Sequence, residues 1–260
     1  MGEGFKLHFR ESGPSDGPPV IFLHGLFASL QNWQTIVKRI SDQYRVFNID
    51  LLNHGSSSHT AKFTFQENVD AILEFMEEQS IDSAQFIGHS LGGKIAMLIA
   101  FQNPSKVQSL LIEDIAPKAY PPWFSFVMKA MKSLDLSAIA SRKEADEILS
   151  EHILEKELRA FLLTNLLKDE SGFKWRIHLD ALISGGPGIS SFPETEASYL
   201  NKTLFIRGEK SPYVETQDHP LIMKHFPNAE IETFEGTDHW VHAREPNLFT
   251  TRLKEFLNQA

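Results

Sequence analysis

The chain has 260 residues and carries 34 acidic against 25 basic side chains, a formal net charge of −9 with histidine neutral. Nucleic acids and anionic lipid surfaces are bound through Lys and Arg, so this acidic balance excludes both as expected partners. The 42% hydrophobic content predicts a folded protein with a large core, and the absence of cysteine excludes disulfides, thiolate metal sites and cysteine nucleophiles.

The sequence predicts neither export nor membrane insertion. Residues 1–12 lack the apolar core of a signal peptide, and no apolar run approaches the roughly 18–20 residues that a membrane span needs. We therefore expect a cytoplasmic protein without a membrane span. Whether it is a monomer or a dimer is left open.

Seven short apolar runs, most of them bounded by Gly, Pro, Asn or Asp, predict β-strands. In chain order they are Phe5–Arg10, Pro19–His24, Arg45–Ile49, Ala84–Gly88, Val107–Asp114, Lys202–Gly208 and Ala229–Glu235. Helical patterns lie between many of them, as in Gln66–Gln79, where apolar residues recur along one face. Strands that alternate with helices predict an α/β fold with a mostly parallel sheet flanked by helices.

Residues 118–198 break this alternation. They show no strand pattern but four helical segments, Pro122–Ser133, Lys143–Ser150, Glu155–Leu167 and Phe173–Ile183. Because so long a loop without structure of its own is improbable, we expect a helical lid over 118–198, inserted before the penultimate strand. The α/β core is then formed by 1–117 and 199–260. Residues 184–188, Ser-Gly-Gly-Pro-Gly, are expected to form the turn that closes the last lid helix.

Ser90 is the predicted nucleophile. The segment Gly88-His-Ser-Leu-Gly92 fits the pattern G-x-S-x-G, follows an apolar strand and opens a helix over 91–101. A serine on such a tight turn adopts a strained backbone conformation, so its neighbours two residues away on either side must lack side chains. Gly88 and Gly92 meet this requirement, and the turn places the hydroxyl at the carboxyl edge of the sheet.

A serine nucleophile needs an adjacent base, usually histidine. In the chain order typical of this arrangement the histidine comes last, and the histidines after the nucleophile are His152, His178, His219, His225, His239 and His242. His239 lies on the loop that follows the last strand and is the predicted base, with His242 as its competitor. The pair has the spacing of metal ligands, but without a third ligand we expect neither a metal nor another cofactor.

The acid that orients the base is harder to assign. Its common position follows the penultimate strand, where this chain has Ser211. Asp114 ends the strand directly after the nucleophile helix and can reach the same imidazole, because parallel strands end at one edge of the sheet. We predict Asp114 as the acid and keep Glu209 and Asp238 as alternatives. Asp50 precedes the nucleophile in the chain and is expected to brace its own loop.

Two backbone N–H groups are predicted to bind the developing oxyanion. One belongs to Leu91, immediately after the nucleophile. The other belongs to Leu26, which Gly25 allows to turn toward the same point, or to Phe27 if the turn is wider. We expect the substrate pocket around these groups to include Phe27, His89, Trp123 and Trp240.

The lid is rich in aromatic residues, which suggests a hydrophobic acyl pocket, although such residues also pack lid helices. Lys174 and Arg176 are candidates to meet an anionic leaving group such as a CoA phosphate, but two residues apart on a helix they would point to different faces. Neither the lid nor the core carries a basic excess. A strongly anionic substrate would therefore need a local cation against the field of the whole chain.

The motifs together resemble the α/β-hydrolase superfamily over essentially the whole chain. The segments that carry the resemblance are His24-Gly25, Asp50-x3-His54-Gly55-x-Ser57, Gly88-His-Ser-Leu-Gly-Gly93 and Gly236-Thr-Asp-His239. Ile112–Pro117 and the missing acid at Ser211 are similar to the YbfF-type branch of bacterial carboxylesterases and acyl-thioesterases. This resemblance implies an acid that follows the strand after the nucleophile helix, which again indicates Asp114.

We therefore expect a serine hydrolase that cleaves a small-molecule ester, or an acyl thioester such as an acyl-CoA, through an acyl-enzyme. Ser90 attacks the carbonyl carbon, His239 takes and returns the proton, and Asp114 holds His239 in its charged form. Three alternatives stay open. They are a carbon–carbon bond hydrolase, which the serine at position 211 disfavours, a perhydrolase or haloperoxidase, and a ligand-binding protein that kept the fold without catalysis.

Overall fold

The computed structural model describes residues 4–170 and 172–258. Residues 1–3 and 259–260 of the predicted core and residue 171 of the predicted lid lie outside these described residues. The described elements are β1 (Phe9–Ser12), β2 (Pro19–Leu23), η1 (Leu30–Trp33), α1 (Gln34–Ile40), β3 (Arg45–Ile49), α2 (Phe65–Glu78), β4 (Ala84–His89), α3 (Leu91–Gln102), η2 (Pro104–Lys106), β5 (Val107–Glu113), α4 (Phe124–Ser133), α5 (Arg142–Ser150), α6 (Lys156–Leu163), β6 (Leu166–Asp169), β7 (Gly172–Trp175), α7 (Leu179–Ser184), α8 (Gly186–Ser190), β8 (Thr203–Gly208), η3 (Thr216–Asp218), α9 (His219–His225), β9 (Ala229–Phe234), α10 (Val241–Arg244) and α11 (Pro246–Asn258).

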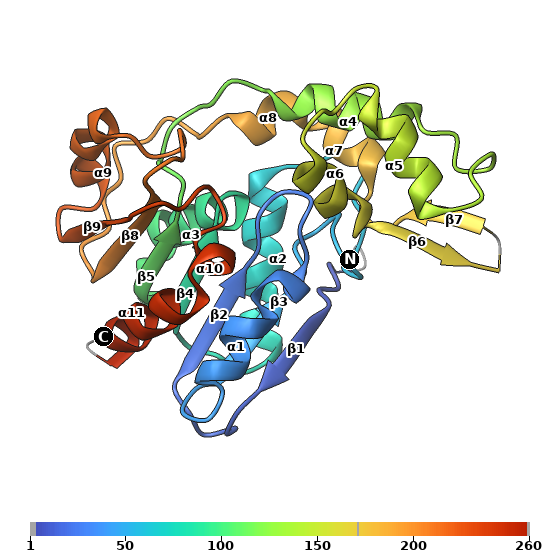
Figure 1. Ribbon diagram of the computed structural model, residues 1–260. Coiled ribbons are helices and arrows are strands. Elements are labelled where there is room, and N and C mark those ends of the chain that lie inside the picture. Colours follow the sequence, from blue (N-terminus) through green and yellow to red (C-terminus); the bar gives the residue numbers. More distant parts are fainter. Residues whose placement is uncertain (1–3, 171, 259–260) are drawn as a thin grey trace.

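A seven-stranded sheet runs through the described core in the order β1-β3-β2-β4-β5-β8-β9 (Figure 1). Strand β1 pairs antiparallel with β3, and every other neighbouring pair is parallel, which confirms the predicted mostly parallel sheet. The first strand begins later than the predicted Phe5–Arg10, because the residues before it bond to a loop. The His8 N–H donates to Ser57 Oγ, and the His8 carbonyl accepts from the Asp50 N–H.

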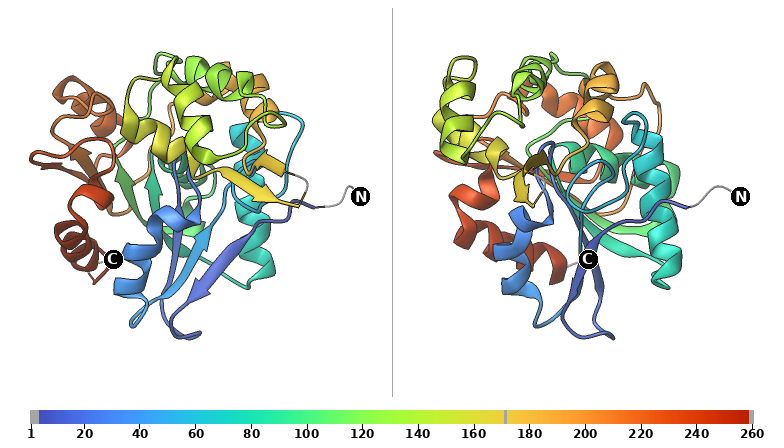
Figure 2. Two further views of the ribbon diagram at one scale, coloured as in Figure 1. Left: turned by 45° about the vertical axis from the view of Figure 1, so that its right-hand side comes forward. Right: turned by 90° about the vertical axis from the view of Figure 1, so that its right-hand side faces the viewer.

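Helices cover both faces of the sheet. Helices α1 and α11 lie on one face, and α2 and α3 lie on the other (Figure 2). Alternate residues of β2 serve the two layers, with Val20 and Phe22 packed on the α1 and α11 side and Ile21 and Leu23 on the other. Burial on both faces explains why such strands are continuous apolar runs. None of the described helices combines the length and apolar character required to cross a membrane.

Residues 118–170 and 172–198 lie across the carboxyl ends of the strands (Figures 1 and 2). The expectation that they contain no strand is wrong, because β6 and β7 form an antiparallel hairpin. The predicted helix Glu155–Leu167 stops at Leu163, and the predicted helix Phe173–Ile183 is replaced by β7 and the short α7. Apolar runs this short fit the periodicity of a strand as well as that of a helix. Gly172, with φ of 113°, starts the second strand of the hairpin.

The predicted turn at 184–188 is also corrected. Gly186–Ser190 form the short helix α8, with Pro187 in its first turn, where a missing N–H costs nothing. The carbonyl groups of Ser190 and Ser191 at the end of this helix accept hydrogen bonds from the Lys94 side chain on α3. A side chain from α3 of the sheet domain thus holds the C-terminal end of α8.

Candidate active site

The register between β4 and β5 places Ser90 and Asp114 side by side. His89 pairs with Glu113 across the two parallel strands, and each candidate residue follows its strand directly. The Ser90 N–H donates to the Glu113 carbonyl at 3.0 Å, and the Asp114 N–H donates to the Ile206 carbonyl of β8 at 2.8 Å. Both side chains therefore start from the carboxyl edge of the sheet, as parallel strands require.

Ser90 has a strained backbone, with φ of 51° and ψ of −113°. A non-glycine residue in such a region costs about 1–3 kcal/mol and persists only where the surroundings force it. A methyl group at Gly92 would lie 2.4 Å from the Leu23 carbonyl oxygen, and one at Gly88 would lie 2.7 Å from the Gly92 carbonyl oxygen. The two glycines thus permit the close packing that holds Ser90 at the start of α3.

Asp114 contacts the imidazole of His239. His239 Nδ1 lies 2.7 Å from Asp114 Oδ2, and because a carboxylate only accepts, the ring donates here. Asp114 is fully buried, and its other oxygen accepts from the Gly208 N–H at 3.0 Å. Ser211 also donates its hydroxyl to Asp114 Oδ2. The serine at the common acid position is therefore bonded to the predicted acid.

The two alternative acids bond elsewhere. Glu209 accepts from the Gly236 N–H at 2.7 Å, in the turn that precedes the histidine loop. Asp238 forms an ion pair with Arg244 at 2.7 Å. Neither carboxylate is bonded to the His239 ring in the described part of the chain, so the structure brings only Asp114 of the three candidates to the predicted base.

His242 belongs to a second buried pair that sequence reasoning missed. Glu113 is fully buried, and its carboxylate accepts from both the Nδ1–H and the backbone N–H of His242, each at 2.7 Å. The ring packs on Trp33 with centroids 4.3 Å apart. An acidic residue inside an apolar strand was the only signal for this pair. It anchors α10 below the loop that carries His239.

Two rings flank the His239 imidazole. Tyr213 stacks on one side with centroids 4.1 Å apart, and His89 lies 4.6 Å away. His89 Nε2–H donates to the His239 carbonyl at 2.9 Å. Burial, and then the nearby His239 and His242, lower the pKa of His89 well below its ordinary value, so His89 is neutral. It therefore holds the His239 loop as an uncharged donor.

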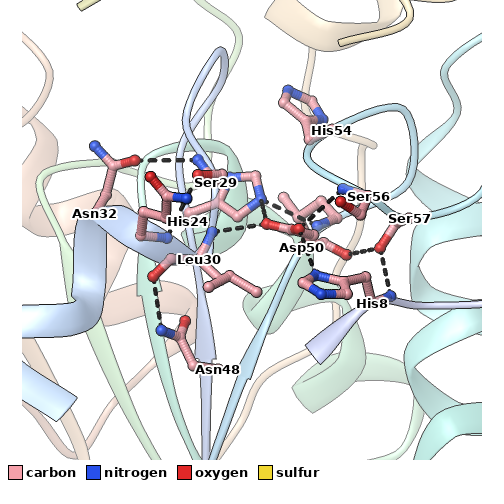
Figure 3. A network of polar contacts seen from close by, with 12 residues as sticks. His8, His24, Ser29, Leu30, Asn32, Asn48, Asp50, His54, Ser56 and Ser57 are labelled. Atoms are coloured by element: carbon pink, nitrogen blue, oxygen red, sulfur yellow. Dashed lines mark hydrogen bonds and ion pairs between the residues drawn. The ribbon is translucent and has the colours of Figure 1, made fainter. Parts of the chain in front are cut away.

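Asp50 braces the loops that follow β2 and β3, as predicted (Figure 3). Its Oδ1 accepts from the Leu30 N–H at 2.8 Å, and its Oδ2 accepts from the His8 ring at 2.8 Å and from the Ser56 N–H at 3.0 Å. Nearby, His24 donates Nδ1–H to the Gly25 carbonyl at 2.8 Å. These bonds tie the ends of β2 and β3 together.

The loop after β2 presents a backbone N–H beside Ser90. A methyl group on Gly25 would lie 3.3 Å from Ser90 Cβ, so this loop packs directly against the serine. The Phe27 N–H donates to His54 Nε2 at 3.3 Å, and burial lowers the pKa of His54 to about 3, which keeps it a neutral acceptor. The Leu26 N–H has no acceptor within the described chain. Of the two candidates, Leu26 therefore offers the free donor.

A pocket of about 730 Å³, its open mouth included, lies above these residues. Most of its lining is apolar or aromatic, and both the sheet domain and the overlying segment contribute. The residues that line it are Leu26, Phe27, Ala28, Asn32, His89, Ser90, Leu91, Lys94, Ile115, Tyr120, Trp123, Phe124, Leu158, Phe161, Ile189, Ser190, Tyr213, His239 and Trp240. The structure thus places both predicted N–H donors and all four predicted pocket residues on one lining. Sequence reasoning missed Lys94, which follows Ser90 by one helical turn.

Lys174 and Arg176 lie away from this pocket. They belong to the hairpin region and not to a helix, and Lys174 pairs with Asp169 at 2.5 Å. Neither residue lines the pocket. Among the described residues, no group of three or more His, Asp or Glu side chains is arranged to hold a metal ion.

The chain is similar to proteins of known family in both sequence and structure. A family model described as the alpha/beta hydrolase fold matches residues 18–246. The chain is 34% identical over 256 residues to the sn-1-specific diacylglycerol lipase ABHD11 of Xenopus tropicalis, covering 95% of this chain and 80% of that protein. It is 29% identical to the esterase YbfF of Escherichia coli, covering 97% and 99%. A solved structure of a marine microorganism esterase matches with a TM-score of 0.93 and 35% identity, covering 97% and 100%.

Proposed function

The chain belongs to the alpha/beta hydrolase family and is a hydrolase, and we propose that it cleaves carboxylic esters through an acyl-enzyme formed on Ser90. The observation that carries this proposal is the bond of 2.7 Å between His239 Nδ1 and Asp114 Oδ2, beside the pocket that Ser90 and His239 both line. Relatives named as a lipase and as esterases support the same class of reaction.

His239 is the proposed general base. Its Nδ1 carries the proton donated to Asp114, so Nε2 is the nitrogen free to accept the Ser90 proton. As the hydroxyl attacks the ester carbonyl, the imidazole becomes charged, and the buried Asp114 carboxylate stabilises that charge. His239 then returns the proton to the departing alcohol. A water molecule then attacks the acyl-enzyme in the same way. His239 takes the proton of the water and returns it to Ser90, and the carboxylic acid is released.

The N–H groups of Leu26 and Leu91 are the proposed donors to the oxyanion. Leu91 is the first residue of α3, where backbone N–H groups have no partner within the helix. The positive end of the helix dipole favours negative charge at the same place. Each such donor contributes roughly 3–4 kcal/mol to the transition state of acyl transfer.

We assign residues 118–198 as the lid of this pocket and 1–117 with 199–260 as the catalytic core. Tyr120, Trp123 and Phe161 of the lid line the pocket together with core residues, which supports a hydrophobic acyl site. The same machinery would cleave an acyl thioester, with a thiol in place of the alcohol.

Labelling with a fluorophosphonate tests the proposal directly. We expect one covalent adduct on the wild type, mapped to Ser90 by mass spectrometry, and none on Ser90→Ala. Ser56→Ala, which removes an exposed hydroxyl outside the pocket, should label like the wild type. A wild type that takes up no label would indicate a ligand-binding protein and contradict the proposal.

The acyl specificity is tested with matched substrates. We expect hydrolysis rates of p-nitrophenyl esters to change with acyl chain length. Each Å² of apolar acyl surface that the lining buries contributes about 25 cal/mol of binding free energy. Butyryl-CoA compared with p-nitrophenyl butyrate measures the preference for thioester or ester. Equal rates across acyl lengths would contradict the apolar pocket.

A further inference from the structure

Lys94 is a buried cation in the substrate pocket. It lies on α3 four residues after Ser90, and its backbone N–H donates to the Ser90 carbonyl at 3.0 Å. The residue is 3% exposed, yet it lines the same pocket as Ser90 and His239. A lysine amine that can carry a positive charge is thus held on the first turn of the helix after the proposed nucleophile.

The partners of this ammonium are all uncharged. Nζ donates to the carbonyls of Ser191 at 2.7 Å and Ser190 at 3.2 Å, and it lies 4.9 Å from the centroid of the Tyr120 ring. A second lysine, Lys118, lies against the same ring but is paired with the Asp218 carboxylate at 2.6 Å. Lys94 has no such counter-ion among the described residues.

A buried cation without a counter-ion is costly, and burial lowers the pKa of Lys94 to about 7. A methionine would fill the same space without this cost. An ammonium has three donors, and the two carbonyls take two of them, which leaves one donor for a further acceptor. The Lys94 ammonium can therefore bind one further acceptor in addition to linking α3 to the lid.

The rest of the lining makes Lys94 the dominant charge of the pocket. None of the described lining residues is acidic, and Lys94 is the one Lys or Arg among them. The chain as a whole carries a formal charge of −9, so this cation is local and opposes the overall field. In apolar surroundings its attraction to an anion is stronger than in water.

We propose that Lys94 binds a carboxylate of the substrate, and that the enzyme therefore prefers esters that carry a second, free carboxylate near the scissile bond. This inference rests on the proposed esterase function and names its substrate class. Ser90 and Lys94 line one pocket, so a substrate that reaches both carries its ester and its free carboxylate in one small molecule. The third donor of Nζ forms the ion pair when such an ester is bound.

The test is a competition between matched esters in one reaction, which gives the ratio of their kcat/KM values. Monoethyl adipate competes with ethyl hexanoate for a carboxylate on the acyl side, and 4-acetoxybutanoate competes with butyl acetate for one on the alcohol side. In the pair that places the carboxylate at Lys94, we expect Lys94→Met to lower the ratio about 10- to 100-fold, as loss of a hydrogen bond to a charged group implies. Lys94→Arg should retain part of the preference.

Lys129→Met is the matched control, because it removes the same charge from an exposed position of α4 outside the pocket and should leave every ratio unchanged. An equal loss on charged and neutral esters in Lys94→Met would show that the lysine only ties the lid to α3, and would overturn the proposal. Unchanged ratios in both pairs would overturn it as well.

A binding measurement separates this proposal from the proposed hydrolysis. Calorimetric titration of adipate into Ser90→Ala should give binding that Lys94→Met in the same background weakens about tenfold or more. If adipate binds equally to both variants, or to neither, the carboxylate site is refuted. If fluorophosphonate fails to label the wild type while adipate binds through Lys94, the hydrolytic function fails and the binding site stands.

Discussion

Replacing Asp114 by asparagine tests the proposed triad most sharply. Three donors converge on the two oxygens of this buried carboxylate, namely the Gly208 N–H at 3.0 Å, the Ser211 hydroxyl and the His239 ring at 2.7 Å. Asparagine has the same shape but offers one oxygen and one NH₂ group, so at least one donor meets another donor. This contact between two donors is avoided at the lowest cost if His239 changes tautomer, so that its Nδ1 accepts a hydrogen bond from the asparagine NH₂ group.

That tautomer places the ring proton on Nε2, the nitrogen proposed to receive the serine proton. A wrong tautomer together with a lost carboxylate costs about 10⁴ in kcat in a Ser-His-Asp triad, or roughly 5 kcal/mol at the transition state. We therefore expect Asp114→Asn to lower kcat on p-nitrophenyl butyrate by about 10³–10⁴. Glu209→Gln, which alters a carboxylate bonded to the Gly236 N–H, should change kcat less than about threefold.

Steady-state kinetics at fixed pH measures both variants, and thermal unfolding checks that Asp114→Asn stays folded. We expect a cost of roughly 2–3 kcal/mol in the free energy of unfolding, because the bonds to a charged acceptor are replaced by weaker ones. A large loss of kcat in Glu209→Gln together with a small one in Asp114→Asn would refute the assignment of the acid.

Further outcomes follow from the same contacts. Gly92→Ala should destabilise the fold by several kcal/mol in urea unfolding, since its methyl group would meet the Leu23 carbonyl at 2.4 Å; an unchanged midpoint would contradict the packing argument. Ser211→Asp in the Asp114→Asn background should recover at least tenfold of the lost kcat, because residue 211 already contacts Asp114 Oδ2; no recovery would show that a carboxylate there cannot serve the histidine. The pKa of Lys94 is lowered from 10.5 to about 7, so between these pH values the unfolded chain binds more protons than the folded one. The stability of the wild type relative to Lys94→Met should therefore rise by roughly 3–5 kcal/mol from pH 7 to pH 10.5. Urea unfolding at several pH values measures this difference, and a difference that does not change with pH would contradict the burial of Lys94.

The sequence predicted the parts of the site that depend on neighbouring residues. The strained turn at Ser90 requires a glycine two residues away on each side, and this requirement is written in a continuous segment. Strand order and parallel pairing then suggested that Asp114 and His239 would meet, although 125 positions separate them. Such an argument works because parallel strands end at one edge.

Other features depend on contacts that no local pattern encodes. Residues 166–167 of β6 and 173–175 of β7 fall within predicted helices, because strands of four residues fit the period of a helix as well as that of a strand. Glu113 and His242 pair from distant strand and helix ends, and the sequence marks neither as a partner of the other. In the sequence, Leu26 and Phe27 are both candidates for the second N–H donor. The structure distinguishes them, because the Phe27 N–H already donates to His54 Nε2.

By itself, then, the sequence determined the fold class, the proposed nucleophile and its helix, since backbone geometry and apolar periodicity are local properties of the chain. Only the tertiary structure decided which side chains are buried together and what charge they meet. Lys94 shows the difference most clearly. In the sequence it is one lysine on an apolar helix. In the fold the sheet and the overlying segment enclose it, with no counter-ion among the described residues, because burial and electrostatic environment are set by elements far apart in the chain.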